Sequence, residues 1–177
     1  MNKEYTIDTK LLDNRVIILS EEINPFSAMK VIKEMLYLDS LNSDDITLYI
    51  NSPGGIVNDG LAIIDTMNFL ESKVITIGMG LCASMAAVIL SNGAKGKRYI
   101  LKNTTVMIHQ PLSGTSGQIS EMEIEIEKSK KVKKKLNEIL AKNTNKTLRI
   151  IEKDTDRNYY LSGNDVVNYG IVDNVIM

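Results

Sequence analysis

Ser84 and His109 are the two side chains of this sequence whose types best suit nucleophilic acyl-transfer chemistry. Ser84 follows a short β-branched run, Val74–Gly78, and precedes a small apolar segment compatible with a helix, Ala83–Leu90. A serine on a sharp strand-to-helix turn exposes its Oγ, and free N–H groups of the first helical turn face a developing oxyanion. Serine is also a common helix N-cap, so a structural role for Ser84 stays open at this point.

His109 is the only histidine of the chain and follows a predicted strand, Thr105–Ile108. A single histidine at a strand end is often structural, but imidazole is the usual base that activates a serine hydroxyl. The sequence therefore offers one candidate base for one candidate nucleophile. Cys82, two residues before Ser84, is an alternative nucleophile, and a small buried packing residue is the other interpretation of this thiol.

A glycine pair and a polar segment are the candidate ligand-binding stretches. Gly54 and Gly55 end the stretch Asn51–Gly55, after a predicted strand and before a predicted helix. They predict a groove in which backbone N–H groups meet a bound carbonyl, with a plain turn as the alternative. No phosphate-loop motif follows. The polar segment Leu112–Gln118 is suited to pair with a peptide by strand addition, or to form an ordinary loop.

Composition and charge argue against several classes of protein. The chain has 177 residues, 44% of them hydrophobic, and a net charge of -1, which indicates one globular domain. The balanced charge argues against a nucleic-acid partner. No apolar run approaches the roughly 20 residues of a membrane span, and the N-terminus lacks a signal-peptide pattern. One cysteine and one histidine argue against a disulfide or a metal site and favour a cytoplasmic location.

Alternating strand and helix patterns predict a β-α architecture. The predicted strands and extended segments are Tyr5–Ile7, Val16–Leu19, Ile46–Ile50, Val74–Gly78, Arg98–Leu101, Thr105–Ile108, Ile171–Val172 and Val175–Ile176. The predicted helices begin at Asn24-Pro25, after Gly55, at Ala83, at Ile119, at Thr147 and at Ser162, and Gly170 ends the last one. Tyr159–Leu161 is predicted to be a tight connection.

The longest predicted helix, about Ile119–Lys142, has glutamates in its N-terminal half and lysines in its C-terminal half. This order suits the helix dipole, and a solvated helix is the simplest interpretation. Two copies lying antiparallel about a two-fold axis would also set each acidic half against the partner's basic half. We therefore expect this helix to be a self-association element.

Taken together, the motifs resemble the proteolytic subunit of the Clp protease family, ClpP, from about Tyr5 to Ile176. The matching stretches are Tyr49–Gly55, Ala83–Ala87, Met107–Leu112, Glu152–Arg157 and Tyr169–Asp173. The resemblance implies one protease domain over residues 1–177, with an α/β fold of stacked β-β-α units like that of the crotonases. It also implies a protruding handle helix at about 119–142 and two heptameric rings, a tetradecamer, stacked face to face around a chamber.

The resemblance also implies a role for each residue at a motif position. Ser84 corresponds to the nucleophile and His109 to the base. The remaining roles are the oxyanion hole for Gly55 and Met85, substrate binding for Gly54, Ser113, Gly114 and Thr115, and ring-ring contact for Asp156, Arg157 and Gln118. The chain itself is expected to need no metal or cofactor, because ATP is used by the partner, a Clp-family AAA+ unfoldase that supplies unfolded proteins.

Asn158 departs from the family pattern, since the matching position usually holds the aspartate of a catalytic triad. A neutral amide can accept a hydrogen bond from the imidazole and orient it, but it cannot stabilise an imidazolium by charge. Asp154, one helical turn earlier, would substitute in part if its side chain reached His109. We therefore expect low peptidase activity in isolation. The four residues before Tyr5 also predict altered gating and docking, because family members usually carry a longer pore-loop segment there.

The sequence thus predicts an ATP-dependent-type serine endopeptidase that cuts unfolded proteins into small peptides. One alternative is a weakly active or inactive ring subunit that supports an active ClpP paralogue in a mixed assembly. Asn158 and the short N-terminal segment favour this alternative. A second is a crotonase-type acyl-CoA enzyme, which shares the fold and the oxyanion hole but leaves the pairing of Ser84 with His109 unexplained.

Overall fold

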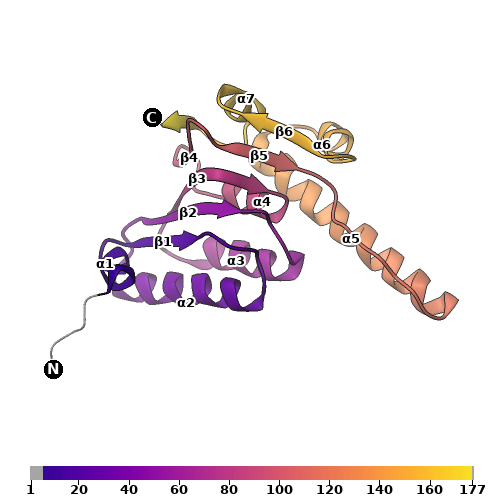
Figure 1. The fold of residues 1–177 in the computed structure, drawn as a ribbon, viewed down its shortest axis with the longest axis horizontal. Coiled ribbons are helices and arrows are strands. Elements are labelled where there is room, and N and C mark those ends of the chain that lie inside the picture. The colour runs from indigo at the N-terminus through magenta and orange to yellow at the C-terminus, as the bar shows by residue number, and fades with distance from the viewer. Residues whose placement is uncertain (1–5, 177) are drawn as a thin grey trace.

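A computed structural model describes residues 6–176, which form a mixed α/β fold around one seven-stranded sheet (Figure 1). The strands are β1 (Val16–Leu19), β2 (Ile46–Ser52), β3 (Val74–Ala83), β4 (Arg98–Leu101), β5 (Thr105–Ile108), β6 (Tyr159–Ser162) and β7 (Asn174–Ile176). The helices are α1 (Ile7–Asp13), α2 (Pro25–Leu41), α3 (Val57–Phe69), α4 (Met85–Ser91), α5 (Ile119–Thr144), α6 (Leu148–Asp154) and α7 (Asn164–Tyr169). The α/β class predicted from the sequence is confirmed.

Strand β3 pairs with different neighbours along its length. Its first half pairs in parallel with β2 and β4, and β7 adds to the far side of β4. Its last residues, Leu81–Ala83, pair in parallel with Thr105–Met107 of β5 in place of β4, while Cys82 still pairs with Ser52 of β2. β5 then pairs with β6 in the antiparallel sense. The carboxyl ends of β3 and β5 therefore lie side by side, where the chain continues into Ser84 and His109.

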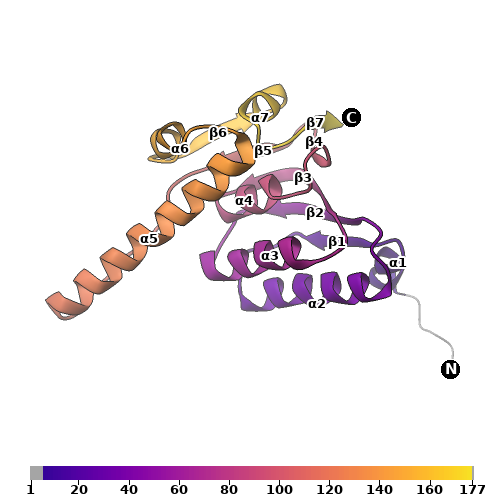
Figure 2. The same cartoon turned by 180° about the vertical axis from the view of Figure 1, so that it is seen from behind.

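Helices pack against the strands of the sheet, and α5 extends away from it (Figure 1). α2 and α3 lie next to each other beside β1 and β2, while α4 packs on β3 and contacts both α3 and α5 (Figures 1 and 2). Every residue of α4 is buried. α5 is 26 residues long and projects well beyond the sheet (Figures 1 and 2). No helix within residues 6–176 is both long and apolar enough to cross a bilayer.

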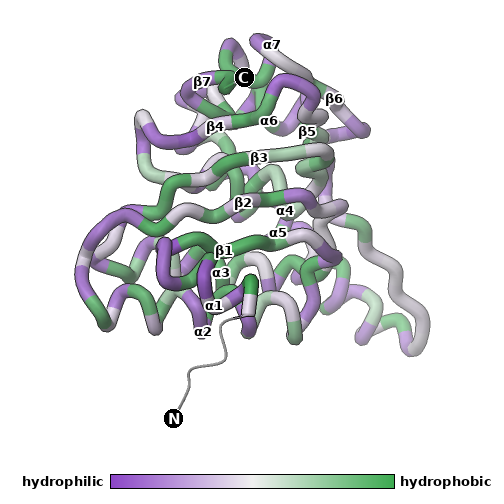
Figure 3. Tube along the Cα trace, turned by 60° about the vertical axis from the view of Figure 1, so that its left-hand side comes forward, coloured by the Kyte–Doolittle hydropathy of each residue, from purple (hydrophilic) through white to green (hydrophobic). Residues whose placement is uncertain are grey.

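The core consists mainly of isoleucine, leucine, valine and methionine from the strands and the facing helix surfaces. Figure 3 shows hydrophobic stretches along the strands β1 and β3. Local signals begin and end the helices around this core. The Asn24 side chain accepts hydrogen bonds from the N–H groups of Phe26 and Ser27 at the start of α2. Gly170, at φ 96, ends α7 as predicted.

The strand predicted at Tyr5–Ile7 is wrong where the structure describes it. Ile7 begins α1, and the side chain of Thr6 caps this helix by accepting a hydrogen bond from the Thr9 N–H. Tyr5 lies outside the described residues. The alternation that suggested a strand is too short to outweigh this capping signal.

The tight connection predicted at Tyr159–Leu161 is also wrong, because these residues belong to β6. Ser162 pairs with Thr105 at the end of this strand, so it does not cap α7. Gly163 takes the N-cap position instead. This strand depends on its partner β5, which is distant in sequence, so a local pattern gives little sign of it.

Candidate active site

Ser84 and His109 meet because β3 and β5 are neighbours. The Ser84 N–H donates a hydrogen bond of 2.8 Å to the carbonyl oxygen of Met107, which extends the ladder by one residue. His109 follows β5 directly. The Ser84 Oγ and the His109 Nε2 are 2.8 Å apart. This distance is within the range expected for a serine nucleophile and its base.

The backbone of Ser84 is not that of an ordinary helix cap. Its φ is 56 and its ψ is -124, a conformation that costs a residue other than glycine about 1–3 kcal/mol. Ser84 occupies the N-cap position of α4, yet its side chain makes no capping hydrogen bond. The hydroxyl is directed to the imidazole instead, so the purely structural interpretation of Ser84 does not account for its geometry.

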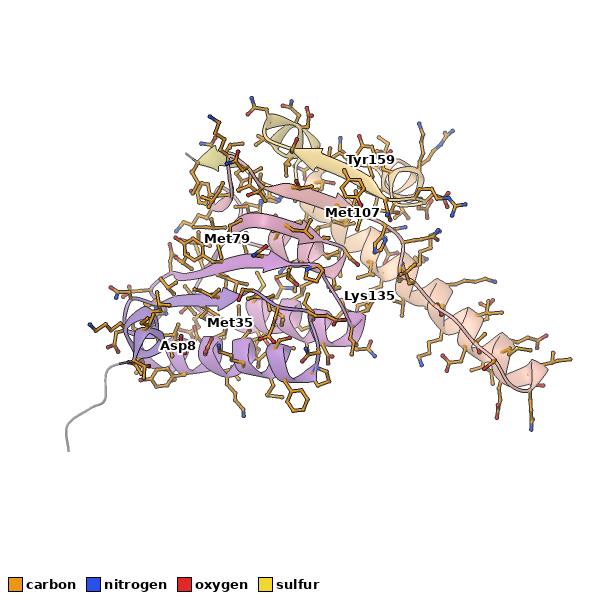
Figure 4. The ribbon with its side chains drawn as sticks, in the orientation of Figure 1. Asp8, Met35, Met79, Met107, Lys135 and Tyr159 are labelled. Atoms are coloured by element: carbon orange, nitrogen blue, oxygen red, sulfur yellow. The ribbon has the colours of Figure 1, made fainter. Side chains whose placement is uncertain are left out.

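Asn158 completes a chain of three polar side chains. The antiparallel pairing of Ile108 with Tyr159 brings the residues before β6 next to those after β5, and Figure 4 labels Met107 and Tyr159 on these neighbouring strands. The Asn158 Oδ1 lies 3.1 Å from the His109 Nδ1. With the proton on Nδ1, the ring donates to this oxygen and leaves Nε2 free to accept the serine proton.

Asp154 does not substitute for the missing carboxylate. Its Oδ2 accepts a hydrogen bond of 2.9 Å from the Tyr169 hydroxyl. Burial, together with the nearby Asp154 carboxylate, raises the pKa of Tyr169 above its usual range, so the hydroxyl stays protonated and donates. The amide of Asn158 is therefore the group that contacts the imidazole Nδ1.

Cys82 is poorly placed to act as the nucleophile. Its side chain is fully buried, and its thiol donates a hydrogen bond of 3.2 Å to the carbonyl oxygen of Ile50. Burial raises the pKa of the Cys82 thiol to about 12, so the thiolate is scarce at neutral pH. The packing interpretation of this residue fits the structure.

Two backbone N–H groups near Ser84 have no hydrogen-bond acceptor within residues 6–176. Those of Gly55 and Met85 form no backbone or side-chain hydrogen bond there, whereas the Gly54 N–H donates to the Ser52 Oγ over 3.1 Å. Gly54 is packed so tightly that a Cβ would lie 2.7 Å from the Ser84 Cβ. Gly54 therefore packs against Ser84, and the two free N–H groups belong to the residues that directly follow Gly54 and Ser84 in the chain.

A cleft of about 500 Å³ opens over these groups. The residues that line it are Glu22, Pro53, Gly54, Gly55, Ile56, Val57, Ser84, His109, Pro111 and Leu112. The segment with Ser113, Gly114 and Thr115 continues from this wall. It is exposed and forms no strand, and Ser113 shares a hydrogen bond of 2.8 Å with Ser129 of α5. Its backbone is therefore unpaired beside the cleft.

The residues predicted at a ring-ring contact lie on the exposed surface. The Arg157 Nε is 3.7 Å from the Asp156 Oδ2, and the two side chains are 89% and 58% exposed. Both line a second cavity of about 420 Å³ that His109 and Asn158 share. Gln118 lies at the start of α5, where its carbonyl accepts from the Met122 N–H.

Three residues at the site carry no signal that the sequence analysis detected. Gln110 and Lys133 form hydrogen bonds that support the segment before Asn158, and Glu22 lines the cleft. Gln110 adjoins His109 and lies in the matching stretch Met107–Leu112, but no role was predicted for it from the sequence. Within residues 6–176 no cluster of histidine, cysteine, aspartate or glutamate is suited to hold a metal ion.

The family described as Clp protease matches residues 1–177, the whole length of the chain.

Proposed function

The chain belongs to the Clp protease family, and on that premise we propose that it is the proteolytic subunit of a chambered, ATP-dependent-type Clp protease. Membership of this family supports a ClpP-like serine peptidase activity. Our proposal adds that Ser84 is the nucleophile, that His109 is the general base, and that unfolded proteins are the substrates.

The proposed reaction follows the order of a serine protease. Ser84 Oγ attacks the peptide carbonyl carbon, and His109 Nε2 takes the hydroxyl proton. The N–H groups of Gly55 and Met85 stabilise the oxyanion, and His109 then protonates the departing amine. Water hydrolyses the acyl-enzyme by the same route, with His109 again as the base. Asn158 acts as a positioning residue that keeps the proton on Nδ1.

One observation carries this proposal: the 2.8 Å contact between Ser84 Oγ and His109 Nε2 beside two backbone donors without acceptors. The unusual backbone of Ser84 supports it, since such conformations cluster at functional sites. A crotonase-type acyl-CoA enzyme would use the two donors but has no need of the serine-imidazole pair. Thioester turnover tests that option.

Family membership implies assembly into rings and association with Clp ATPases in general. We propose two heptameric rings in contact through α5 as the handle helix, with the β-β-α units stacked as in crotonases. Asp156, Arg157 and Gln118 would lie at this contact. The partner AAA+ unfoldase would consume the ATP and deliver unfolded chains, and peptides would bind along Gly54 and the Ser113–Thr115 segment.

Labelling with a serine-reactive phosphonate tests the mechanism. We expect one label per chain on Ser84 and loss of labelling in Ser84→Ala, together with loss of peptide turnover. Ala occupies the same volume apart from the hydroxyl, so it serves as the matched control. Labelling at another residue, or turnover that survives in Ser84→Ala, would contradict the proposal.

A ring subunit without activity of its own is the second candidate, because the group facing His109 Nδ1 is an exposed, neutral amide. In that case the phosphonate would fail to label Ser84 in isolated chains. Particle mass, measured alone and with any ClpP paralogue, would then reveal a mixed assembly.

A further inference from the structure

Glu22 is held at the edge of the cleft by its own backbone. It lies in the connection between β1 and α2, and its carbonyl oxygen accepts hydrogen bonds from Ser27 Oγ at 2.8 Å and Asn24 Nδ2 at 3.1 Å. The next residue, Ile23, forms an isolated parallel bridge with Gly55. The position of Glu22 relative to the oxyanion-hole glycine is therefore set by the fold, and only its side chain is free to turn.

The backbones of Ile23 and Gly55 are packed closely at this bridge. The Ile23 N–H donates to the Gly54 carbonyl oxygen over 2.8 Å, and the Ile56 N–H donates to the Ile23 carbonyl oxygen over the same distance. A Cβ at Gly55 would lie 2.2 Å from the Ile23 carbonyl oxygen, so glycine is required there. The connection that carries Glu22 thus forms one wall of the cleft.

The charge of Glu22 is the distinctive feature of this wall. Apart from His109, it is the only ionisable side chain among the residues that line the cleft. The others are Ser84, glycines, prolines and aliphatic residues. Within residues 6–176 its carboxylate takes part in none of the ion pairs or side-chain hydrogen bonds. The charge is therefore available to a ligand in the cleft.

We propose that Glu22 determines specificity at this site by selecting substrates with a lysine or arginine side chain next to the scissile bond. This inference depends on the proposed function of the site. Long basic side chains match the cleft, because their methylene groups can lie on Ile56 and Leu112 while the charged end reaches the carboxylate. A charge on an otherwise neutral wall also favours cationic over anionic peptides as they approach.

The expected size of the effect is modest. Glu22 is exposed, and ion pairs at exposed positions are worth a few-fold in an equilibrium or rate constant, about two- to fivefold. We therefore expect a preference of about threefold in kcat/KM for lysine over glutamine at one peptide position, with glutamate disfavoured by a similar factor. High salt should reduce it.

The experiment compares matched fluorogenic peptides cut by the assembled protein. Lysine, glutamine or glutamate is placed at each position on either side of the cut in turn, and kcat/KM ratios are measured for wild type, Glu22→Gln, Glu22→Lys and Glu21→Gln. Glu21 is an exposed glutamate one residue away that does not line the cleft. Its variant makes the same change in net charge, so it controls for long-range effects.

We expect the lysine preference in wild type and Glu21→Gln, its loss in Glu22→Gln, and a preference for glutamate in Glu22→Lys. A flat profile in wild type, or a preference that persists in Glu22→Gln, overturns the proposal. Binding of the same peptides to Ser84→Ala, measured by fluorescence anisotropy, is an independent arm. It reports the lysine preference without turnover, so failure of Ser84 chemistry and failure of the Glu22 role are distinguishable.

Discussion

Lys133 of α5 donates a hydrogen bond of 2.8 Å to the Oε1 of Gln110, the residue directly after His109. The Gln110 Nε2 donates over 2.8 Å to the carbonyl oxygen of Asp156, and its N–H donates over 2.6 Å to that of Thr155. The segment before Asn158 is therefore held by the residue next to His109, and that residue is held by Lys133 of α5.

Replacing Gln110 should lower catalysis by loosening this segment. For Gln110→Ala we expect kcat to fall by about tenfold with a smaller change in KM, because imidazole orientation rather than substrate contact is lost. Lys133→Gln should act in the same direction with a smaller effect. Lys134→Gln is the matched control, since the ion pair of Lys134 within residues 6–176 is with Glu138 of the same helix, at 3.9 Å. A change confined to KM would contradict the positioning role.

Asn158→Asp should raise peptide turnover. A carboxylate at 3.1 Å from Nδ1 would stabilise the imidazolium by charge as well as orient the ring. We expect a rise in kcat of at least tenfold, with about 10⁴ as the upper limit set by aspartate-to-asparagine changes in serine proteases. Asn158→Ala should instead lower kcat. If turnover in Asn158→Asp stays flat or falls, the amide does not limit the enzyme.

Gly60→Ala should disturb the oxyanion hole through Met85. A Cβ at Gly60 would lie 2.2 Å from the Met85 Cγ, so the buried Met85 side chain must move and strain the start of α4. We expect a loss of about 1–3 kcal/mol in the free energy of unfolding and a lower kcat. Gly114→Ala, where an added Cβ meets nothing within 4 Å, should leave the melting temperature unchanged. Losses in Gly60→Ala and Met85→Ala that simply add in the double variant would rule out this clash.

Asp173 should contribute stability that is lost in acid. Burial acts to raise the pKa of Asp173, but hydrogen bonds from Arg98 outweigh burial and hold this pKa below its ordinary value of 3.8. The contribution is therefore present above that value and is lost as the pH falls through the folded-state pKa. Asp173→Asn should lower the free energy of unfolding by about 1–3 kcal/mol at neutral pH.

Urea unfolding at neutral pH and in steps below pH 4 measures this contribution. The acid-induced loss of stability should be shallower in Asp173→Asn than in wild type, because the variant no longer titrates there. Equal slopes in the two proteins would show that Asp173 is not the titrating group.

Self-association through α5 should weaken with salt. Glu123 and Lys131 line the same exposed groove of this helix, and an antiparallel partner would set one against the other. We expect particle mass to fall at high salt, and each single charge reversal, Glu123→Lys or Lys131→Glu, to lower it at low salt. The double reversal should restore part of the assembly. A mass independent of salt and of these changes would exclude electrostatic pairing.

The sequence predicted the parts of the fold that local patterns determine. The strands Val16–Leu19, Arg98–Leu101 and Thr105–Ile108 have the predicted bounds, and α2 starts at the predicted Asn24-Pro25 signal. Ser84 was identified from its residue type and its place on a turn before a predicted helix, and His109 from its residue type and its place after a predicted strand. Their proximity follows from the pairing of β3 with β5, which no local pattern specifies.

The supporting contacts were not predictable for the same physical reason. Glu22 reaches the cleft through the bridge between Ile23 and Gly55, and Lys133 reaches Gln110 from a helix that begins after a long loop. The hydrogen bond from the Gly54 N–H to the Ser52 Oγ likewise depends on the conformation of the turn between these residues. Long-range side-chain and backbone contacts of this kind appear only once the elements are packed.

Position 84 has a counterpart within the same molecule. Gly163, the residue before α7, has φ 52 and ψ -131, nearly the conformation of Ser84 before α4 at φ 56 and ψ -124. Glycine adopts these angles freely, whereas a residue with a side chain is hindered there. The turn before α7 has a glycine, the residue that suits these angles. The turn before α4 has a serine, which adds a hydroxyl group. The turn at Ser84 therefore costs the fold some stability that the turn at Gly163 does not, which fits the nucleophile role that we propose for Ser84.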